Sequence, residues 1–347
     1  MSPFKRNQGK GEESMRSKES RAVGRSAHRA QKKSPPVKGI SPESLRGMSL
    51  SFKHPDNPNI TQGWLTITPE IAQSILRHNT ANRDLKKRNS ATINRAMVTG
   101  YWNDENPDPI VFNEEGFLDN GQHRLTQVVE TGTTIVALVV IGVSSSVMGT
   151  LDQAAPRSLA DRLTVEEKRT GRSFRNKDKI SAVVTGLMLY DSKPDLSVIT
   201  NSGSGFPINE QYDYFISKAE YVDELVAWSR TMNKKAKPFR NLLTVRRAAI
   251  FRYALEQGGA NAEDIHEFFD GLVGMTVPAQ PVLKLRDKLE SLQTQQEKGL
   301  RLPPRYTFAF LIKGWNAFLS GSEVKQFRWS PGGKSQDQFP ELVFTLE

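Results

Sequence analysis

The sequence predicts an α+β protein in which a small domain with a mixed sheet precedes a mostly α-helical domain. Between residues 66 and 143, segments with apolar residues three and four positions apart alternate with short β-branched runs. Beyond residue 163 the long segments carry helical spacing, whereas the first 50 residues hold few apolar side chains. The predicted divisions are therefore a disordered basic tail (1–50), a sheet domain (51–163) and a helical domain (164–347).

The sheet domain is predicted to begin with two helices. Thr68 is a suitable N-cap with Pro69 at the first helical position, and "SATINRAMVTG" predicts a second helix that ends at Gly100. The runs "PIVF" and "FLD" flank the turn "NEEG" and predict a short hairpin. A helix after Gly121 and the strand "TTIVALVVIGV" complete the order α-α-β-β-α-β.

The last predicted strand is apolar on both of its faces. Val136, Leu138 and Val140 alternate with three further apolar residues. We therefore expect this strand to be central, covered by helices on at least one side, and almost completely buried.

The second domain is predicted to be helical because six of its segments carry apolar residues at three- and four-residue spacing. "LLTVRRAAIFRYALEQGG" is one example, and an intervening "SGSGFPINE" predicts a break between the first two. The six predicted helical segments are 176–192, 209–232, 242–259, 262–273, 280–293 and 305–321.

The composition excludes several classes of protein. The absence of cysteine removes disulfides, thiolate metal clusters and cysteine nucleophiles, and the five histidines show no metal-ligand spacing, so no metal site is predicted. No Walker loop or dinucleotide-binding glycine fingerprint occurs. The longest apolar run, Thr134–Val143, is shorter than the roughly 20 residues that a membrane span needs. We expect a cytoplasmic protein without a membrane partner.

The net charge of +10 lies mainly in the tail. Residues 1–50 hold 12 Lys and Arg against 4 Asp and Glu, whereas the other 297 residues hold 36 against 34. Two interpretations stay open for this tail: a solubilising leader, or an electrostatic arm that binds nucleic acid.

A second basic stretch lies in the helical domain, where Arg230 to Arg252 includes eight Lys and Arg and no acidic residue. Arg240 and Arg247 are expected on one side of a helix, which would give a basic face for DNA. The alternative is an ordinary solvated surface. The candidate DNA contacts are Lys234, Lys235, Lys237, Arg240 and Arg247.

The segment "FLDNGQHRLTQVVETG", residues 117–132, predicts an anion site. A glycine between a strand and a helix allows a tight turn, and the first N–H groups of the helix then attract a phosphate. With Leu125, Val128 and Val129 facing the core, His123 should lie opposite them, flanked by solvent-facing neighbours on either side. The alternative is an ordinary Asn-Gly turn with polar residues at a helix start.

The motif "LDNGQHRL", with a hairpin before it and "VVETG" and a valine-rich strand after it, resembles the "DGQHR" signature of the ParB/sulfiredoxin superfamily. The resemblance covers about residues 60–163, including "LDQAAPRSLADRL", and extends to uncharacterised proteins of bacteria and their phages. In that superfamily the loop and helix start bind nucleotide phosphates, of ATP in sulfiredoxin and of CTP in ParB proteins.

The resemblance implies roles for particular residues. Gly121 would form the turn, Gln122 would supply a polar contact, and His123 and Arg124 would bind phosphates. Asn120 adjoins the same site but replaces a common aspartate, which argues against metal binding or proton abstraction there. Arg83, in the lead-in to the domain, is a further candidate nucleotide contact.

Two functions follow from the resemblance and the charge. The first is a ParB-like, nucleic-acid-associated protein that binds a nucleoside triphosphate (CTP or ATP, with or without Mg²⁺) and contacts DNA through its tail and helical domain. The second is a nucleotide-dependent enzyme of the same fold: a hydrolase, a phosphotransferase or a phage base-modification pyrophosphorylase. No carboxylate cluster supports the nuclease label that many such proteins carry.

Overall fold

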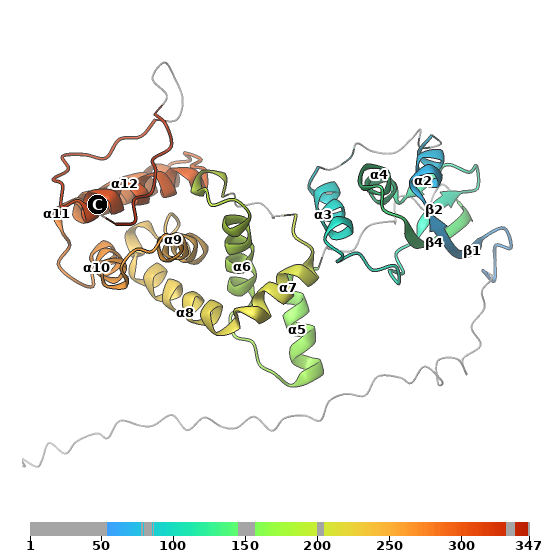
Figure 1. Cartoon of the computed structure of the whole chain (residues 1–347), viewed down its shortest axis with the longest axis horizontal. Coiled ribbons are helices and arrows are strands. Elements are labelled where there is room, and N and C mark those ends of the chain that lie inside the picture. The colour runs from blue at the N-terminus through green and yellow to red at the C-terminus, as the bar shows by residue number, and fades with distance from the viewer. Residues whose placement is uncertain are drawn as a thin grey trace, which may run out of the picture. The chain divides into compact units, whose positions relative to one another are not determined.

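The structure is a computed structural model that describes residues 54–77, 79, 85, 87–144, 157–199, 205–330 and 337–345. Within these residues a four-stranded mixed sheet with three helices is followed by a helix-rich C-terminal part (Figure 1). This confirms the predicted α+β class. The predicted tail, residues 1–50, lies outside the described residues.

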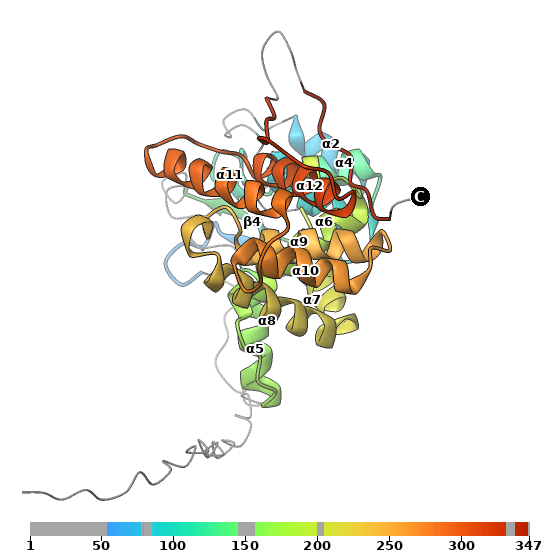
Figure 2. The same ribbon diagram turned by 90° about the vertical axis from the view of Figure 1, so that its left-hand side faces the viewer.

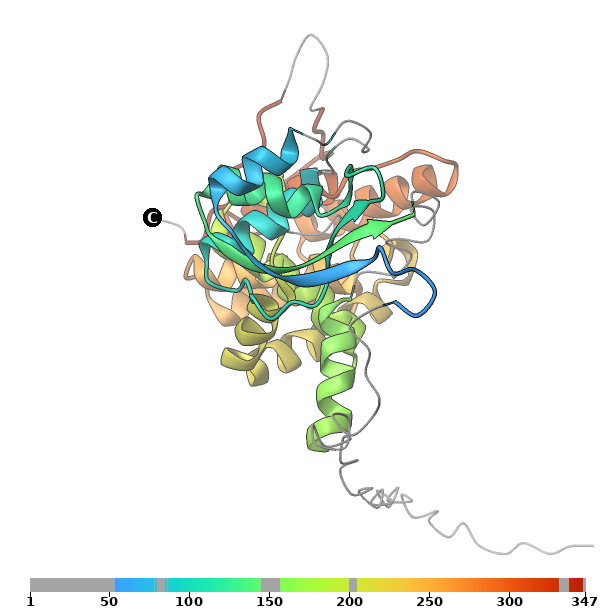
Figure 3. The same ribbon diagram turned by 90° about the vertical axis from the view of Figure 1, so that its right-hand side faces the viewer.

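The sheet has the order β1-β4-β2-β3. Strand β4 lies between an antiparallel neighbour, β1, and a parallel neighbour, β2, which in turn pairs antiparallel with β3. Figure 3 shows β1 (blue) running beside the longer β4 (green). The strands are β1 (Thr61–Ile67), β2 (Ile110–Asn113), β3 (Leu118–Asn120) and β4 (Ile135–Val143).

Three helices cover one face of the sheet: α2 (Pro69–Leu76), α3 (Lys87–Val98) and α4 (Gln122–Thr131). The hydroxyl of Thr68 accepts a hydrogen bond from the Ile71 amide at 3.3 Å, which confirms the predicted start of α2. Helix α3 begins a turn before the predicted segment. The shared core holds Ala72, Met97, Leu125 and Val128 from these helices and Ile67, Ile110, Leu118, Ile135, Ala137 and Val139 from the strands.

Strand β1 was not predicted. Six of its seven residues are exposed, including Trp64 and Leu65, and only Ile67 is buried. The strand lies at the sheet edge. An edge strand with little burial needs no regular alternation of apolar residues, so its sequence carries a weak signal.

The predicted central place of β4 is confirmed, but its predicted burial is wrong. Ile135, Ala137 and Val139 face the helices and are buried. The alternate residues Val136, Leu138 and Val140 are only half-buried, and Ile141, which follows Val139 on the helical side, is 49% exposed. In the part of the chain that the structure describes, helices cover only the first of these two faces.

The C-terminal part is built from eight helices within the described residues (Figure 2). All six predicted segments are helical, although the second is broken at Lys218. An additional helix begins at a capping box formed by Ser158 and Asp161. The helices are α5 (Leu159–Thr170), α6 (Lys177–Ser192), α7 (Ile208–Ser217), α8 (Ala219–Lys235), α9 (Val245–Gln257), α10 (Ala262–Val273), α11 (Gln280–Glu297) and α12 (Pro304–Leu319), with short 3₁₀ turns η2 (Leu196–Val198) and η3 (Lys237–Phe239).

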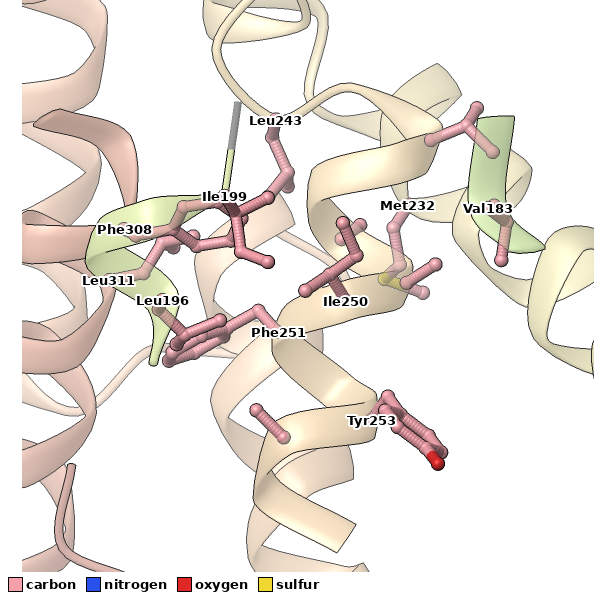
Figure 4. Packing of buried hydrophobic residues seen from close by; sticks show 14 of the residues in the cluster. Val183, Leu196, Ile199, Met232, Leu243, Ile250, Phe251, Tyr253, Phe308 and Leu311 are labelled. Atoms are coloured by element: carbon pink, nitrogen blue, oxygen red, sulfur yellow. The ribbon is translucent and has the colours of Figure 1, made fainter. Parts of the chain in front are cut away.

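Helix α9 forms the middle of the second core. Its residues Ile250 and Phe251 are fully buried, with Val183 of α6 on one side and Phe308 and Leu311 of α12 on the other (Figure 4). A helix that is apolar on most of its circumference must be surrounded by other helices. None of the described helices is both long and apolar enough to span a bilayer.

Candidate functional site

The candidate phosphate site lies at the junction of β3 and α4. Gly121 adopts a left-handed conformation with φ of 109°, and its carbonyl accepts the first helical hydrogen bond from Leu125 at 3.0 Å. A Cβ atom at this glycine would lie 2.9 Å from Cγ1 of Ile110. Both the conformation and the close packing therefore require glycine, as expected for a tight strand-to-helix turn.

The sequence predicted that Arg124 lies on the solvent side of α4, and this prediction is wrong. The residue is only 6% exposed, and its guanidinium donates to the carbonyls of Asp108 and of Pro109, the latter at 2.6 Å. Its Nη2 also lies 3.5 Å from the carboxylate of Asp108. The prediction is wrong because the buried arc of α4 is wider than Leu125, Val128 and Val129 indicate, and also includes Gln127.

Asn120 and Arg124 bind the same backbone segment, the one that leads into β2. Its side-chain amide donates to the carbonyl of Pro109 at 3.3 Å. Two of the predicted nucleotide ligands thus hold the backbone that leads into β2. This contact keeps β2, β3 and the start of α4 in one fixed arrangement.

Gln122 and His123 lie in the first turn of α4, and both are half-buried. The structure therefore brings Asn120, Gly121, Gln122, His123 and Arg124 together at one helix start. Arg83 lies outside the described residues. Asn120, Gln122 and His123 retain partial access to solvent at this helix start, whereas Gly121 and Arg124 are buried.

Asp119 adjoins this site and was not chosen from the sequence as a functional residue. Its Oδ1 accepts a hydrogen bond from Nδ2 of Asn113 at 3.2 Å, whereas its Oδ2 is buried without a hydrogen-bond partner. Burial raises the pKa of this carboxyl above its ordinary value. Leu118 faces the core, so the alternation of side chains along β3 is the sequence signal that could have identified Asp119 as a residue near the site.

The acidic loop before β2 is structural. Oδ1 of Asp104 accepts hydrogen bonds from Nε1 of Trp102 and from the amide of Val136, each at 3.0 Å, and so ties the loop to β4. Asn103 closes a turn by accepting from the Glu105 amide at 2.8 Å. Among the described residues, no group of three or more histidine or acidic side chains is arranged to hold a metal ion.

Five exposed cations form what we term the basic segment, which runs from the end of α8 through η3. The amide of Asn233 fixes this turn by donating to the carbonyls of Arg240 and Leu243, at 2.8 and 2.9 Å. None of the five cations forms an ion pair with a carboxylate of the described chain. The basic segment consists of Arg230, Lys234, Lys235, Lys237 and Arg240.

Arg247 does not share the exposed face with Arg240, which corrects the prediction. It is 6% exposed, and its Nη1 donates to the carbonyls of Asn241 and Leu242 at 3.0 and 2.9 Å. Burial, and the neighbouring charge of Arg246, lower the pKa of Arg247 to about 10. Arg240 precedes α9, so helical spacing does not relate the two residues.

The two remaining cations of the stretch, Arg246 and Arg252, are also engaged. Nε of Arg246 donates to the carbonyl of Ala182 at 3.0 Å. Arg252 forms ion pairs with Glu224 at 3.2 Å and Glu256 at 2.6 Å. The eight cations of the stretch therefore divide into five on the surface and three that hold the helices together.

No protein-family model, curated protein or solved structure matches this chain. The resemblance to the ParB/sulfiredoxin superfamily therefore stays a prediction.

Proposed function

We propose that this chain is a nucleic-acid-associated protein whose sheet domain binds a nucleoside triphosphate. The observation that carries the proposal is the basic segment, with its five exposed cations and no ion-pair partner among the described carboxylates. Cations that lie close together on a fixed turn attract a polyanion, because each neutralised phosphate releases condensed counterions. DNA is the partner that this charge pattern favours, and the basic tail would add to the same attraction.

Neutralising four of the five cations in the basic segment should flatten the salt dependence of DNA binding. In the full chain, changing Lys234, Lys235, Lys237 and Arg240 to glutamine should reduce the log–log slope by about 0.9 for each phosphate contact that is lost. Fluorescence anisotropy with a labelled duplex, titrated at several salt concentrations, measures this slope.

The matched control removes four surface cations that already have carboxylate partners. Replacing Arg169, Lys179, Lys193 and Lys284, which pair with neighbouring acids, changes the net charge by the same amount. We expect this variant to keep most of the slope. Equal losses in both variants would show that only net charge matters, and no salt-dependent affinity in the unchanged chain would refute the nucleic-acid proposal.

The nucleotide part of the proposal depends on the β3–Gly121–α4 junction. Gly121 has no side chain to cap the helix, and the positive end of the α4 dipole attracts phosphate. His123 and Gln122 can approach a ligand from this helix start, whereas Arg124 and Asn120 hold the surrounding backbone. CTP and ATP are the candidates, as their triphosphates carry the charge that this arrangement favours.

Replacing Gln122 and His123 together with alanine should abolish triphosphate binding with little loss of stability, because both side chains are only half-buried. Calorimetric titration with ATP, CTP, GTP and UTP measures the binding. Glu130→Gln, at the far end of α4, is the control and should bind as the unchanged protein does. Full affinity in a folded double variant would contradict the site.

The alternative function, a nucleotide-dependent enzyme, predicts a different result from the same titrations. Fast release of phosphate or pyrophosphate in the presence of an acceptor would favour it. Binding that alters DNA affinity, with slow or no hydrolysis, favours the nucleic-acid-associated protein.

A further inference from the structure

The sheet has a second face that no described helix covers. In the antiparallel pairing of β1 with β4, Trp64 lies opposite Leu138, Thr66 opposite Val136, and Gln62 opposite Val140. Opposed residues point to the same side of a sheet. We term these six residues the open face. Trp64, near its middle, is 55% exposed.

The open face is uncharged and largely apolar. It holds a tryptophan, two valines and a leucine. Strand β1, which contributes three of its residues, lacks the lysine or proline that commonly protects an edge strand. Exposed apolar surface of this kind generally marks a contact with another segment or molecule. A polyanion has no counter-charge here, so the open face is distinct from the basic segment.

The segment that precedes the described residues joins them close to the open face. The described residues begin at His54 and reach β1 through a short segment in which the carbonyl of Asn59 packs against Gly142 at the end of β4. Eight residues, 53–60, therefore separate Phe52 from the start of β1. They can span about 26 Å when extended, whereas neighbouring strands are only about 4.8 Å apart.

The sequence changes character just before this point. Residues 1–39 carry 11 Lys and Arg against 3 acidic residues, whereas residues 40–52, "ISPESLRGMSLSF", carry one of each. The second segment is thus neutral and matches an uncharged surface. It also holds five large apolar side chains: Ile40, Leu45, Met48, Leu50 and Phe52.

We propose that residues 40–52 pack on the open face and cover Trp64. The apolar side chains of the segment would be buried against Trp64, Val136 and Leu138, which removes both surfaces from water. The short connection to β1 keeps the segment at a high effective concentration. The basic arm is then residues 1–39, and residues 40–52 anchor it to the sheet.

The absence of cysteine in the natural chain allows a direct test by cross-linking. The full chain carrying Leu45→Cys and Thr66→Cys is treated with a short bismaleimide, and the products are separated by mass. We expect an intramolecular cross-link in high yield. The control pair, Leu45→Cys with Gln73→Cys on the exposed side of α2, should cross-link weakly, since Gln73 lies on the helical side of the sheet.

Equal yields in the two pairs would overturn the proposal, because the segment would then have no preferred face. A product that is only intermolecular would show instead that a second copy of the chain occupies the open face. That outcome would also overturn it.

A second measurement does not depend on introduced thiols. Leu45→Asp with Met48→Asp should increase the acrylamide quenching of Trp64, obtained as the difference from the same chain with Trp64→Phe. Ser44→Asp with Ser49→Asp adds the same charge at polar positions and should leave the quenching unchanged. The same quenching in both variants would contradict the proposed contact.

Discussion

Replacing Arg124 with alanine is expected to lower the free energy of unfolding by about 3 kcal/mol. The guanidinium is buried and satisfies the carbonyls of Asp108 and Pro109, so its removal leaves two acceptors in the lead-in to β2 without their charged donor. Trp102 packs against the core of the sheet. Urea unfolding followed by the fluorescence of Trp102, obtained as the difference from the same chain with Trp102→Phe, measures the change.

His123→Ala is the control for this prediction. His123 is only half-buried, so this variant should lose less than about 1 kcal/mol of stability. If Arg124→Ala instead unfolds like the unchanged protein while triphosphate binding disappears, Arg124 is a ligand and its structural role is refuted.

Replacing Gly121 with alanine should also cost about 3 kcal/mol. An alanine at φ of 109° is strained by roughly 1–2 kcal/mol, and its Cβ would press into Ile110 at 2.9 Å within a close-packed core. Since the turn holds the start of α4, triphosphate binding should fall together with stability. Unfolding and nucleotide titrations on the same sample measure both effects.

Gly132, at the other end of α4, offers a matched control. It also has a positive φ, 69°, but a Cβ there would meet no atom within 4 Å. Gly132→Ala should therefore cost about 1 kcal/mol, from the backbone conformation alone. Equal losses at the two glycines would mean that the contact with Ile110 contributes nothing.

Local signals in the sequence were sufficient for much of the fold. The hydroxyl of Thr68 and the glycines at both ends of α4 each act within one helical turn. Such contacts depend on residues three or four positions apart, so the sequence alone predicts them.

Contacts between distant segments were not predictable in the same way. Arg124 can be buried because carbonyls about fifteen positions earlier accept hydrogen bonds from its guanidinium, and no periodicity in α4 indicates this. The charged side chain of Arg247 can also be buried, because carbonyls in the turn before α9 accept its hydrogen bonds. Because six of the seven residues of β1 are exposed, its sequence lacks the alternation of apolar and polar residues by which strands are recognised.

The pairing of β1 with β4 also has a consequence for how the chain folds. The hairpin of β2 and β3 and the following α4 are contiguous in sequence, whereas Ile67 must find Ile135 across the whole of the intervening unit. The entropy of closing that loop is lost before the pairing yields any stabilisation, so β1 should join a sheet that is already formed. In newly synthesised chains, β1 would then stay unpaired until β4 has left the ribosome.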